Sequence, residues 1–323
     1  MKALAVFSGG LDSMLAVQLI RAQGIEVLGL FFETPFFSSS TAKKSAAEIN
    51  LPIRVVDLTE SHLEVLKEPR YGYGENLNPC IDCHILMVRK AGETLESEGA
   101  AFVVTGEVLG QRPMSQNRKA LSLVASESGI PDLVLRPLSA KLLPATLPEQ
   151  KGWVDRDRLL GLSGRSRKPQ IALAKELGIE KYPSPAGGCL LTDPGFSRRM
   201  RDLLSSSSDL QLREIELLKV GRHFRIGPAT KLIIGRNERE NRFIRDFYRE
   251  GDLLLAPLSV PGPTALAIGE VSPEQEGLVA SMTAAYSDPG DGEEVDVGLG
   301  PRASARTLRV KRKEKKEFRA LMI

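Results

Sequence analysis

ALAVFSGGLDSMLAVQLIRAQG, residues 3–24, joins three local signals in a fixed order. ALAVF at residues 3–7 is an uninterrupted apolar run, as expected for a strand buried in a parallel sheet. A turn with two glycines follows. Residues 12–23 then space their apolar side chains as in an amphipathic helix, which Gly24 ends. Strand, glycine turn and helix in this order predict the first half-unit of an α/β domain.

The same alternation continues along the first part of the chain. Apolar runs predict further strands, and amphipathic segments predict helices between them: strands at 27–32, 53–58 and 101–106, helices at 41–50 and 85–98. Short connections between alternating elements predict a doubly wound parallel sheet, with its ligand at the carboxyl ends of the strands. We therefore expect an α/β domain over residues 1–182.

A Ser-, Gly- and Pro-rich passage separates this pattern from a different one. It runs through 182–195, and we expect a linker at 183–195 that carries Cys189. Beyond it, short apolar runs punctuated by Gly and Pro, with a helix at 238–249, predict a smaller α+β domain over residues 196–323. The segment 302–319 contains nine basic residues and two glutamates, so this domain is expected to end in a basic tail that is either a solvated face or a phosphate contact.

Composition excludes several classes of protein. The chain has 323 residues, 42% of them hydrophobic and 26% charged, which excludes disordered, collagen-like and small disulfide-rich proteins and makes two domains the expectation. No apolar window approaches the ~18 residues of a membrane span. The first residues are a strand and not a signal peptide, so a cytoplasmic protein is expected. The net charge of +3 does not by itself indicate nucleic-acid binding.

SGGLDS, residues 8–13, connects the first strand to the first helix. Two glycines let the backbone approach a phosphate, and the N–H groups at the start of the helix point at it. Ser8 and Ser13 add hydroxyl donors, and Asp12 can either orient Mg²⁺ or cap the helix. The loop lacks the lysine of GxxxxGK(S/T), so it is not a Walker loop. The alternative is an ordinary glycine-rich turn.

The six residues resemble the PP-loop of the ATP pyrophosphatases, which cleave ATP between the α and β phosphates and adenylate a substrate. The resemblance implies an adenine nucleotide alpha hydrolase-like fold that uses ATP and Mg²⁺. It also implies that the adenine and ribose lie against the backbone near Phe31 and Phe32. The residues implied to hold the pyrophosphate are Ser8, Gly9, Gly10, Asp12 and Ser13.

The chain has three cysteines, in the string CIDCH at 80–84 and at position 189 after two glycines. In a cytosolic enzyme they are expected to bind metal or act in catalysis rather than form a structural disulfide. Cys80, Cys83 and Cys189 can hold three irons of a [4Fe-4S] cluster and leave one iron free. With His84 they can hold zinc, although adjacent ligands strain a tetrahedral site. A redox pair carrying a persulfide, or a c-type haem attachment, are the other interpretations.

Together with the PP-loop, the three cysteines resemble those of the iron–sulfur-dependent tRNA thiolases, in which sulfide on the free iron attacks an adenylated uridine. This resemblance implies catalytic roles for Asp12, Cys80, Cys83 and Cys189. TGEVLGQ, residues 105–111, is similar to a stretch of the 4-thiouridine synthetase family. It implies that Thr105, Gly106 and Gln111 face the nucleotide. The cationic loop at 163–168 can contact tRNA phosphate or pyrophosphate, or simply lead into a helix.

Two features depart from the 4-thiouridine synthetase pattern. No long extension precedes the PP-loop, and no rhodanese-type cysteine segment follows, which favours free sulfide over a persulfide as the sulfur donor. In the second domain, VGRHFR at 220–225 and IGRNEREN at 234–241 resemble the RNA-binding module at the end of NFACT proteins. That resemblance, with guanidinium groups that suit phosphates, assigns RNA contacts to Arg222, Arg225, Arg236, Asn237 and Asn241.

The sequence therefore predicts an ATP-dependent tRNA sulfurtransferase that adenylates a uridine carbonyl and replaces its oxygen with sulfur. Its expected partners are tRNA and a sulfide or persulfide donor, with no membrane; a homodimer and a monomer are both open. Three alternatives stay open: a PP-loop small-molecule ligase or amidotransferase, an RNA-binding protein without catalysis, and a desulfidase that uses the same three cysteines.

Overall fold

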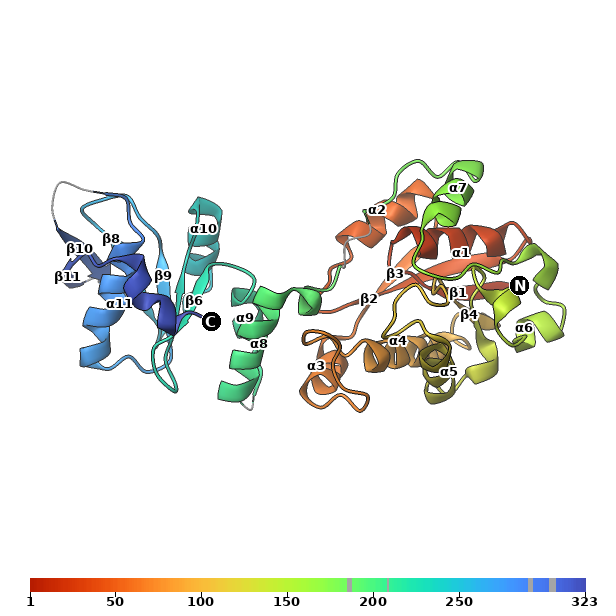
Figure 1. Ribbon diagram of the computed structural model, residues 1–323, viewed down its shortest axis with the longest axis horizontal. Helices are drawn as coiled ribbons and strands as arrows, with labels where there is room; N and C mark the ends of the chain where they lie inside the picture. The colour runs from red at the N-terminus through yellow and green to blue at the C-terminus, as the bar shows by residue number, and fades with distance from the viewer. Residues whose placement is uncertain (185–187, 208, 290–292, 302–305) are drawn as a thin grey trace. The chain divides into compact units, whose positions relative to one another are not determined.

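The computed structural model describes residues 1–184, 188–207, 209–289, 293–301 and 306–323 (Figure 1). The chain forms two compact units, Met1–Thr192 and Asp193–Ile323, and each is described by itself. Cys189, expected in a linker, lies within the first unit. No helix in the described part of the chain combines the length and the apolar character needed to cross a bilayer.

The first unit contains a five-stranded parallel sheet in the order β3-β2-β1-β4-β5. The strand β1 lies at its centre, paired with β2 on one side and β4 on the other. The strands are β1 (Lys2–Val6), β2 (Glu26–Glu33), β3 (Ile53–Asp57), β4 (Phe102–Thr105) and β5 (Val134–Leu135). The predicted parallel α/β architecture is confirmed.

Helices cover both faces of this sheet (Figure 1). In β1, Ala3 and Ala5 pack into the core beneath α1, whereas Leu4 packs on the opposite face with residues of α4. Side chains of a strand alternate between faces, so an all-apolar strand must be covered twice. The α-helices of the unit are α1 (Leu11–Arg21), α2 (Ser40–Glu48), α3 (Thr59–Lys67), α4 (Cys80–Thr94), α5 (Arg118–Glu127), α6 (Leu147–Gln150) and α7 (Lys168–Glu176).

The strand order places the candidate site. The chain leaves β1 toward β2 and β3 and later returns to the other side of β1 as β4, so the order of the strands reverses between β1 and β4. Ligands of open parallel sheets bind at such a reversal, beyond the carboxyl ends of the strands. Residues 8–13 follow β1 and residues 106–112 follow β4, and they meet there.

The helix α4 begins earlier than its apolar spacing predicts. We expected a helix at 85–98 after the cysteines, but α4 starts at Cys80, immediately after Pro79. Asp82 in its first turn accepts hydrogen bonds from the backbone nitrogens of Arg70 and Tyr71, at 3.1 Å each. Cys80 and Cys83 therefore lie three residues apart on a helix, where side chains share one face.

The second unit is built on a six-stranded antiparallel sheet in the order β11-β10-β8-β9-β7-β6. One face packs on α11 through residues such as Val279 and Met282, and the other packs on α9 and α10 through Leu217 and Ile244. Its elements are α8 (Pro194–Ser206), α9 (Leu212–Leu217), β6 (Arg222–Arg225), β7 (Lys231–Ile234), α10 (Glu238–Asp246), β8 (Leu253–Pro257), β9 (Ala265–Ile268), α11 (Pro273–Ala285), β10 (Glu294–Leu299) and β11 (Arg306–Lys311). The predicted separate domain of mixed helices and strands is confirmed.

The basic segment at the end of the chain belongs to this fold. Arg306–Lys311 forms the edge strand β11, and a 3-10 turn at Lys315–Leu321 follows it. Phe318 in that turn is 3% exposed and packs into the core on the α11 side. Residues 302–305 lie outside the described residues. An aromatic anchor and a paired strand hold residues 306–323 in the unit.

Candidate active site

The PP-loop is held in shape by its own serines and by α2. Gly9 has a φ of +76°, and a Cβ there would stand 2.6 Å from the Cα of Ala42, so only glycine fits. Ser45 donates a hydrogen bond to the Gly9 carbonyl at 2.7 Å. Ser13 donates to the Gly10 carbonyl at 2.7 Å, and Ser8 Oγ accepts from the Gly10 nitrogen at 3.3 Å. The loop is therefore preorganised without a ligand.

The segment after β4 packs directly on this loop. A Cβ on Gly106 would lie 2.5 Å from the backbone nitrogen of Ser13 and 2.7 Å from the carbonyl carbon of Asp12. No side chain fits in that space without moving the start of α1. The predicted close approach at Gly106 is therefore an approach to the PP-loop backbone itself.

Asp12 is held by a chain of two amides. Gln111 Nε2 donates to Asp12 Oδ2 at 2.7 Å, and Gln170 Nε2, from α7, donates to Gln111 Oε1 at 3.0 Å. Because Gln170 occupies the Gln111 oxygen, the Gln111 amide must turn its NH₂ group toward Asp12. The other carboxylate oxygen, Asp12 Oδ1, is buried and has no hydrogen-bond partner among the described residues. The site therefore offers one free anionic oxygen beside the PP-loop.

Glu107 links the same segment to the cysteine-bearing helix. Its carboxylate is 6% exposed and contacts His84 Nδ1 at 2.8 Å, Arg136 Nε at 2.8 Å and Thr105 Oγ1 at 3.0 Å. Burial alone would raise the pKa of Glu107, but Arg136 and His84 outweigh it and lower the pKa to about 2. Glu107 is therefore a buried anion that orients the histidine next to Cys83.

The three cysteine thiols are brought together. All are half-buried and free. Burial, followed by the charges of Cys189 and Cys80, raises the pKa of Cys83 well above its ordinary value. Burial also raises the pKa of Cys189 to about 11, with a contribution from Cys80, against a lowering effect of the Leu191 and Thr192 backbone and of Arg112. The three thiols therefore lie near enough for their charges to interact.

Backbone contacts fix Cys189 in this cluster. Leu190 donates its N–H to the Phe36 carbonyl at 3.0 Å, and Leu77 donates to the Leu191 carbonyl at 3.3 Å. The Asn76 side chain donates to the Thr192 carbonyl at 2.9 Å. The segment after Cys189 is thus tied to the loop that precedes α4, although 105 residues lie between Cys83 and Cys189 in the sequence.

The three cysteines and the nearby acidic and histidine side chains are the donors available to a metal. Within the ranges that the structure describes, no group of three or more His, Cys, Asp or Glu side chains is gathered as a single metal ion requires. A four-iron cluster is larger than one ion, so its thiolate ligands stand farther apart. Thiolates are the ligands of iron–sulfur clusters, so the chemistry of the three cysteine side chains is compatible with one.

Residues 105–112 connect the two halves of the site. Gly106 and Gln111 touch the PP-loop residues Asp12 and Ser13, whereas Glu107 holds the histidine beside Cys83. Arg112, the next residue, is close enough to Cys189 to favour its thiolate electrostatically. One short segment thus contacts the candidate nucleotide loop and the histidine next to Cys83, and it interacts electrostatically with Cys189.

The remaining predicted residues of this unit lie around the same edge of the sheet. Thr105 is buried and bonded to Glu107. The Phe31 side chain belongs to the hydrophobic core and packs edge-on against Phe37, with ring centroids 6.2 Å apart. The cationic loop at 163–168 lies beside 109–111, because the Gly164 nitrogen donates to the Leu109 carbonyl at 2.8 Å.

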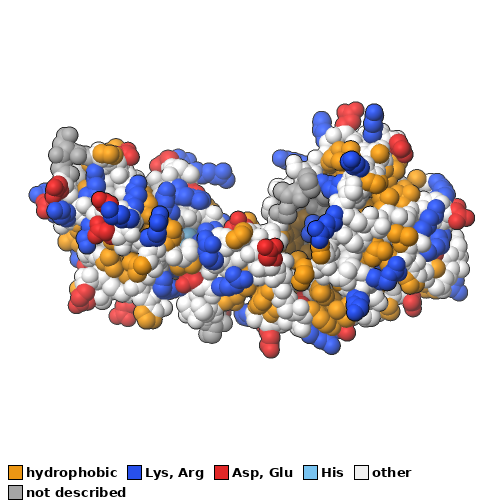
Figure 2. Space-filling view, in the orientation of Figure 1, with side chains coloured by type: hydrophobic (Ala, Val, Ile, Leu, Met, Phe, Trp, Pro, Cys, Tyr) orange, Lys and Arg blue, Asp and Glu red, His pale blue; other side chains and the backbone are white. Residues whose placement is uncertain are grey.

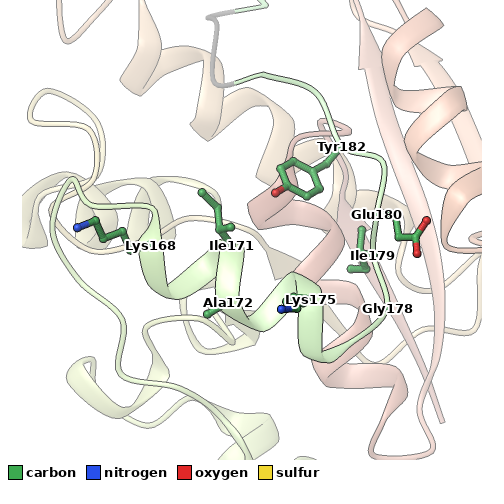
Figure 3. A pocket seen from close by; sticks show the side chains of 8 residues that line it. All are labelled: Lys168, Ile171, Ala172, Lys175, Gly178, Ile179, Glu180 and Tyr182. Atoms are coloured by element: carbon green, nitrogen blue, oxygen red, sulfur yellow. The ribbon is translucent and has the colours of Figure 1, made fainter.

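A hollow of about 520 Å³ lies elsewhere on this unit, along the outer side of α7 (Figure 3). Its walls come from α7 and from the segment that follows it, and none of the predicted site residues except Lys168 of the cationic loop lines it. The lining residues are Lys168, Ile171, Ala172, Lys175, Gly178, Ile179, Glu180 and Tyr182. Gln170 of the same helix reaches Gln111 instead, so this hollow is separate from the amide chain.

In the second unit, the predicted RNA-binding residues have partners within the fold. Arg225 forms two hydrogen bonds with Asp202 of α8, at 2.5 and 3.0 Å, and Arg236 pairs with Glu240 at 2.5 Å. The arginines thereby fasten the sheet to α8 and the turn to α10. Arg222 lies 4.8 Å over the ring of Tyr286.

The two predicted asparagines also hold backbone. Asn237 caps α10 by accepting from the Glu240 nitrogen at 3.0 Å, and Asn241 is 8% exposed and accepts from the Thr264 nitrogen at 3.0 Å. The GRNxxxN pattern is thus used to build the turn before α10.

Comparison with known proteins found a family match in each of the two units. Residues 1–141 match the family model described as thiamine biosynthesis protein (ThiI), and residues 221–322 match the NFACT protein RNA binding domain. The first matched region lies in the first unit of the fold and the second lies in the second unit. The predicted resemblance to a PP-loop sulfurtransferase domain and to an NFACT module is confirmed.

Curated relatives match part of the chain. A probable tRNA sulfurtransferase of Thermoanaerobacter sp. (strain X514) is 26% identical over 148 residues, covering 42% of this chain and 36% of the relative. Another, of Staphylococcus aureus (strain Newman), is 29% identical over 148 residues, covering 42% of this chain and 34% of the relative. The chain thus spans about a third of the length of these relatives.

Among solved structures, a predicted subunit of a tRNA methyltransferase from Methanocaldococcus jannaschii is similar at 14% identity. The match covers 55% of this chain and 76% of that one, with a TM-score of 0.36. A likeness this weak carries no argument about function.

Two residues of the first unit were not singled out from the sequence. Gln170 and Arg136 support Asp12 and Glu107, respectively. Each interrupts an apolar environment: Gln170 shares the buried side of α7 with Ala174, and Arg136 follows the buried β5. A polar residue at a position where the pattern requires an apolar one is the signal that could have found them.

Proposed function

We propose that this chain is an ATP-dependent tRNA sulfurtransferase. The observation that carries the proposal is the segment 105–112. Gly106 and Gln111 contact the PP-loop, Glu107 contacts His84 next to Cys83, and Arg112 interacts electrostatically with Cys189. Chemistry that activates a substrate with ATP and then attacks it with sulfur needs both centres within reach of one substrate atom. A reaction that consumes ATP and tRNA is expected in the cytoplasm.

In the first step, the PP-loop binds the nucleotide. The backbone N–H groups at the start of α1 and the hydroxyls of Ser8 and Ser13 hold the phosphates, with Gly9 and Gly10 giving the backbone room to approach. Adenine lies against the backbone near Phe31 and Thr105. The free Asp12 Oδ1 suits Mg²⁺, which prefers oxygen ligands and would neutralise phosphate charge when bound.

The proposed reaction consists of two substitutions, the first at the α phosphorus of ATP and the second at the uridine ring carbon. The uridine carbonyl oxygen attacks the α phosphorus of ATP, and pyrophosphate leaves with the electron pair of the broken P–O bond. A sulfur nucleophile then attacks the activated ring carbon, and the former carbonyl oxygen leaves as part of AMP. Arg112 and the donors of the PP-loop stabilise the negative charge that develops on the phosphates.

The sulfur centre is Cys80, Cys83 and Cys189. Burial keeps Cys83 and Cys189 protonated, so these thiols are poor nucleophiles until a cation or a metal favours their thiolates. Their convergence supports ligation of a [4Fe-4S] cluster, which when bound by three thiolates offers one iron without a protein ligand. Glu107 fixes the orientation of His84 beside this centre. Sulfide or a persulfide is the donor.

Two measurements on protein purified without oxygen test the proposal. With tRNA, ATP and sulfide, wild type is expected to release AMP and to form a thionucleoside that mass spectrometry detects, whereas Asp12→Asn should form neither and still bind tRNA. Iron and acid-labile sulfide are measured on the same sample. About four irons per chain, lost in Cys189→Ala, support the cluster. Thiolation by iron-free protein would transfer the role to a cysteine persulfide, and a wild type that forms no thionucleoside would contradict the proposal.

A further inference from the structure

The arginines around α10 fall into two groups. Arg236 pairs with Glu240, and Arg245 pairs with Glu238 at 2.8 Å, so their charges are used within the fold. Arg239 and Arg242 are exposed, and neither forms an ion pair with any residue of the described ranges. Arg239 and Arg242 thus form no ion pair among the described residues, whereas Arg245, the third arginine of α10, is paired.

The free arginines share one side of the helix. Arg239, Arg242, Phe243 and Asp246 have the spacing of a single helical face, and together they line a hollow of about 370 Å³. Phe243 stacks on Phe247, with ring centroids 4.5 Å apart and planes inclined by 19°. Both rings are half-buried against the core beneath α10, so Phe243 has one side in the core and another in the hollow.

The two arginines and the aromatic ring together suit a particular class of ligand. Arginine forks suit phosphate oxygens, and an accessible aromatic ring suits the face of an unpaired base. The carboxylates near the face are Asp246, which lines the hollow, and Glu238, which is held by Arg245. Lys and Arg side chains gather over α10 on the face seen in Figure 2.

We propose that the outer face of α10 is the RNA-contact surface of the second unit. An unpaired RNA segment places its phosphates on Arg239 and Arg242 and one base against Phe243. This inference rests on the proposed function for the presence of RNA, and it moves the contact away from Arg225, Arg236, Asn237 and Asn241. Those four residues have structural partners, whereas Arg239 and Arg242 form no ion pair with any residue that the structure describes.

The test compares two double variants of the full chain that lose the same charge. Arg239→Ala/Arg242→Ala removes the unpaired guanidinium groups. Arg306→Ala/Arg309→Ala is the matched control, because these exposed residues on β11 pair with Glu276 and Asp296. Binding of tRNA and of a short unstructured oligoribonucleotide is measured by fluorescence anisotropy over a series of salt concentrations.

We expect the α10 variant to bind both RNAs at least about tenfold more weakly. A plot of log K against the logarithm of the salt concentration should become less steep by about two, one for each lost phosphate contact. The control should change the slope little. Phe243→Leu, which keeps an apolar core residue, should weaken oligoribonucleotide binding by about fivefold or more without changing the slope. Far-UV circular dichroism of each variant confirms that α10 is intact.

Three results would overturn the inference: no change in the α10 variant, an equal loss in both double variants, or equally tight binding of polyglutamate. The last would assign the surface to an acidic protein. Failure of the sulfurtransferase proposal is separable, because thionucleoside formation is measured independently. RNA affinity that depends on Arg239 and Arg242 without any thiolation would keep this inference and reject the enzyme.

Discussion

Replacing Glu107 by Gln tests the electrostatic reasoning about the site. Glu107 is a buried anion between Arg136 and His84, and its pKa of about 2 lies well below the ordinary value of 4.5. Each unit of pKa difference corresponds to about 1.4 kcal/mol, so the ionised form is stabilised by about 3 kcal/mol in the folded protein. This figure already includes the interaction with Arg136, whose counter-charge Glu107→Gln removes.

The pH dependence has a definite sign. Because the folded-state pKa is lowered, the stabilisation is complete above the ordinary pKa of 4.5 and is lost as the pH falls toward about 2. The difference between wild type and Glu107→Gln should therefore be about 3 kcal/mol at about pH 7 and shrink to about 1 kcal/mol near about pH 3. The difference in free energy of unfolding between wild type and Glu107→Gln is thus smallest in acid.

The chain provides a local probe for this measurement. Trp153 is its one tryptophan and packs against the core of the first unit, so urea unfolding followed by its fluorescence reports on that unit. Glu127→Gln is the matched control, since Glu127 pairs with the exposed Arg70, and it should change stability by less than about 1 kcal/mol. Equal losses in the two variants, or a Glu107→Gln difference that does not depend on pH, would refute the reasoning.

Three further changes test other parts of the structure. Gln111→Leu removes the donor to Asp12, a hydrogen bond to a charged group worth about 1.5–3 kcal/mol, and should lower kcat/KM for ATP by about 10- to 150-fold; unchanged kinetics would remove Gln111 from the site. Gly106→Ala should displace the start of α1 and reduce ATP binding in a titration, whereas Gly99→Ala, in an open turn, should leave ATP affinity unaltered. Phe318→Ala should destabilise the second unit by about 3–5 kcal/mol in thermal unfolding, and a loss below about 1 kcal/mol would mean that residues 306–323 are not anchored.

The sequence predicts the sheet of the first unit well, because its strands are short apolar runs bounded by glycine turns. The strand at 3–7 and the loop at 8–13 place the nucleotide site through topology alone. The start of α4 was harder to predict: its first turn contains Cys80, Asp82 and Cys83, none of which has apolar periodicity. Asp82 instead stabilises that turn through two backbone nitrogens of a preceding loop.

Contacts between distant segments account for the rest of what the sequence could not give. Gln170 reaches Asp12 through Gln111, and Arg136 reaches His84 through Glu107, across separations that no local pattern encodes. In the second unit the arginine-rich pattern does not tell paired from unpaired side chains. Only the fold distinguishes Arg236, neutralised by Glu240, from Arg239, which projects without a partner among the described residues.

The central claim is that ATP activation and sulfur transfer occur at one site in the first unit. A single-turnover reaction with tRNA, ATP and sulfide, in which AMP and thionucleoside are quantified together, tests it most directly. We predict equal amounts of the two products from wild type, and AMP without thionucleoside from Cys189→Ala. Thionucleoside formed without ATP, or formed at the wild-type rate by Cys189→Ala, would contradict the claim.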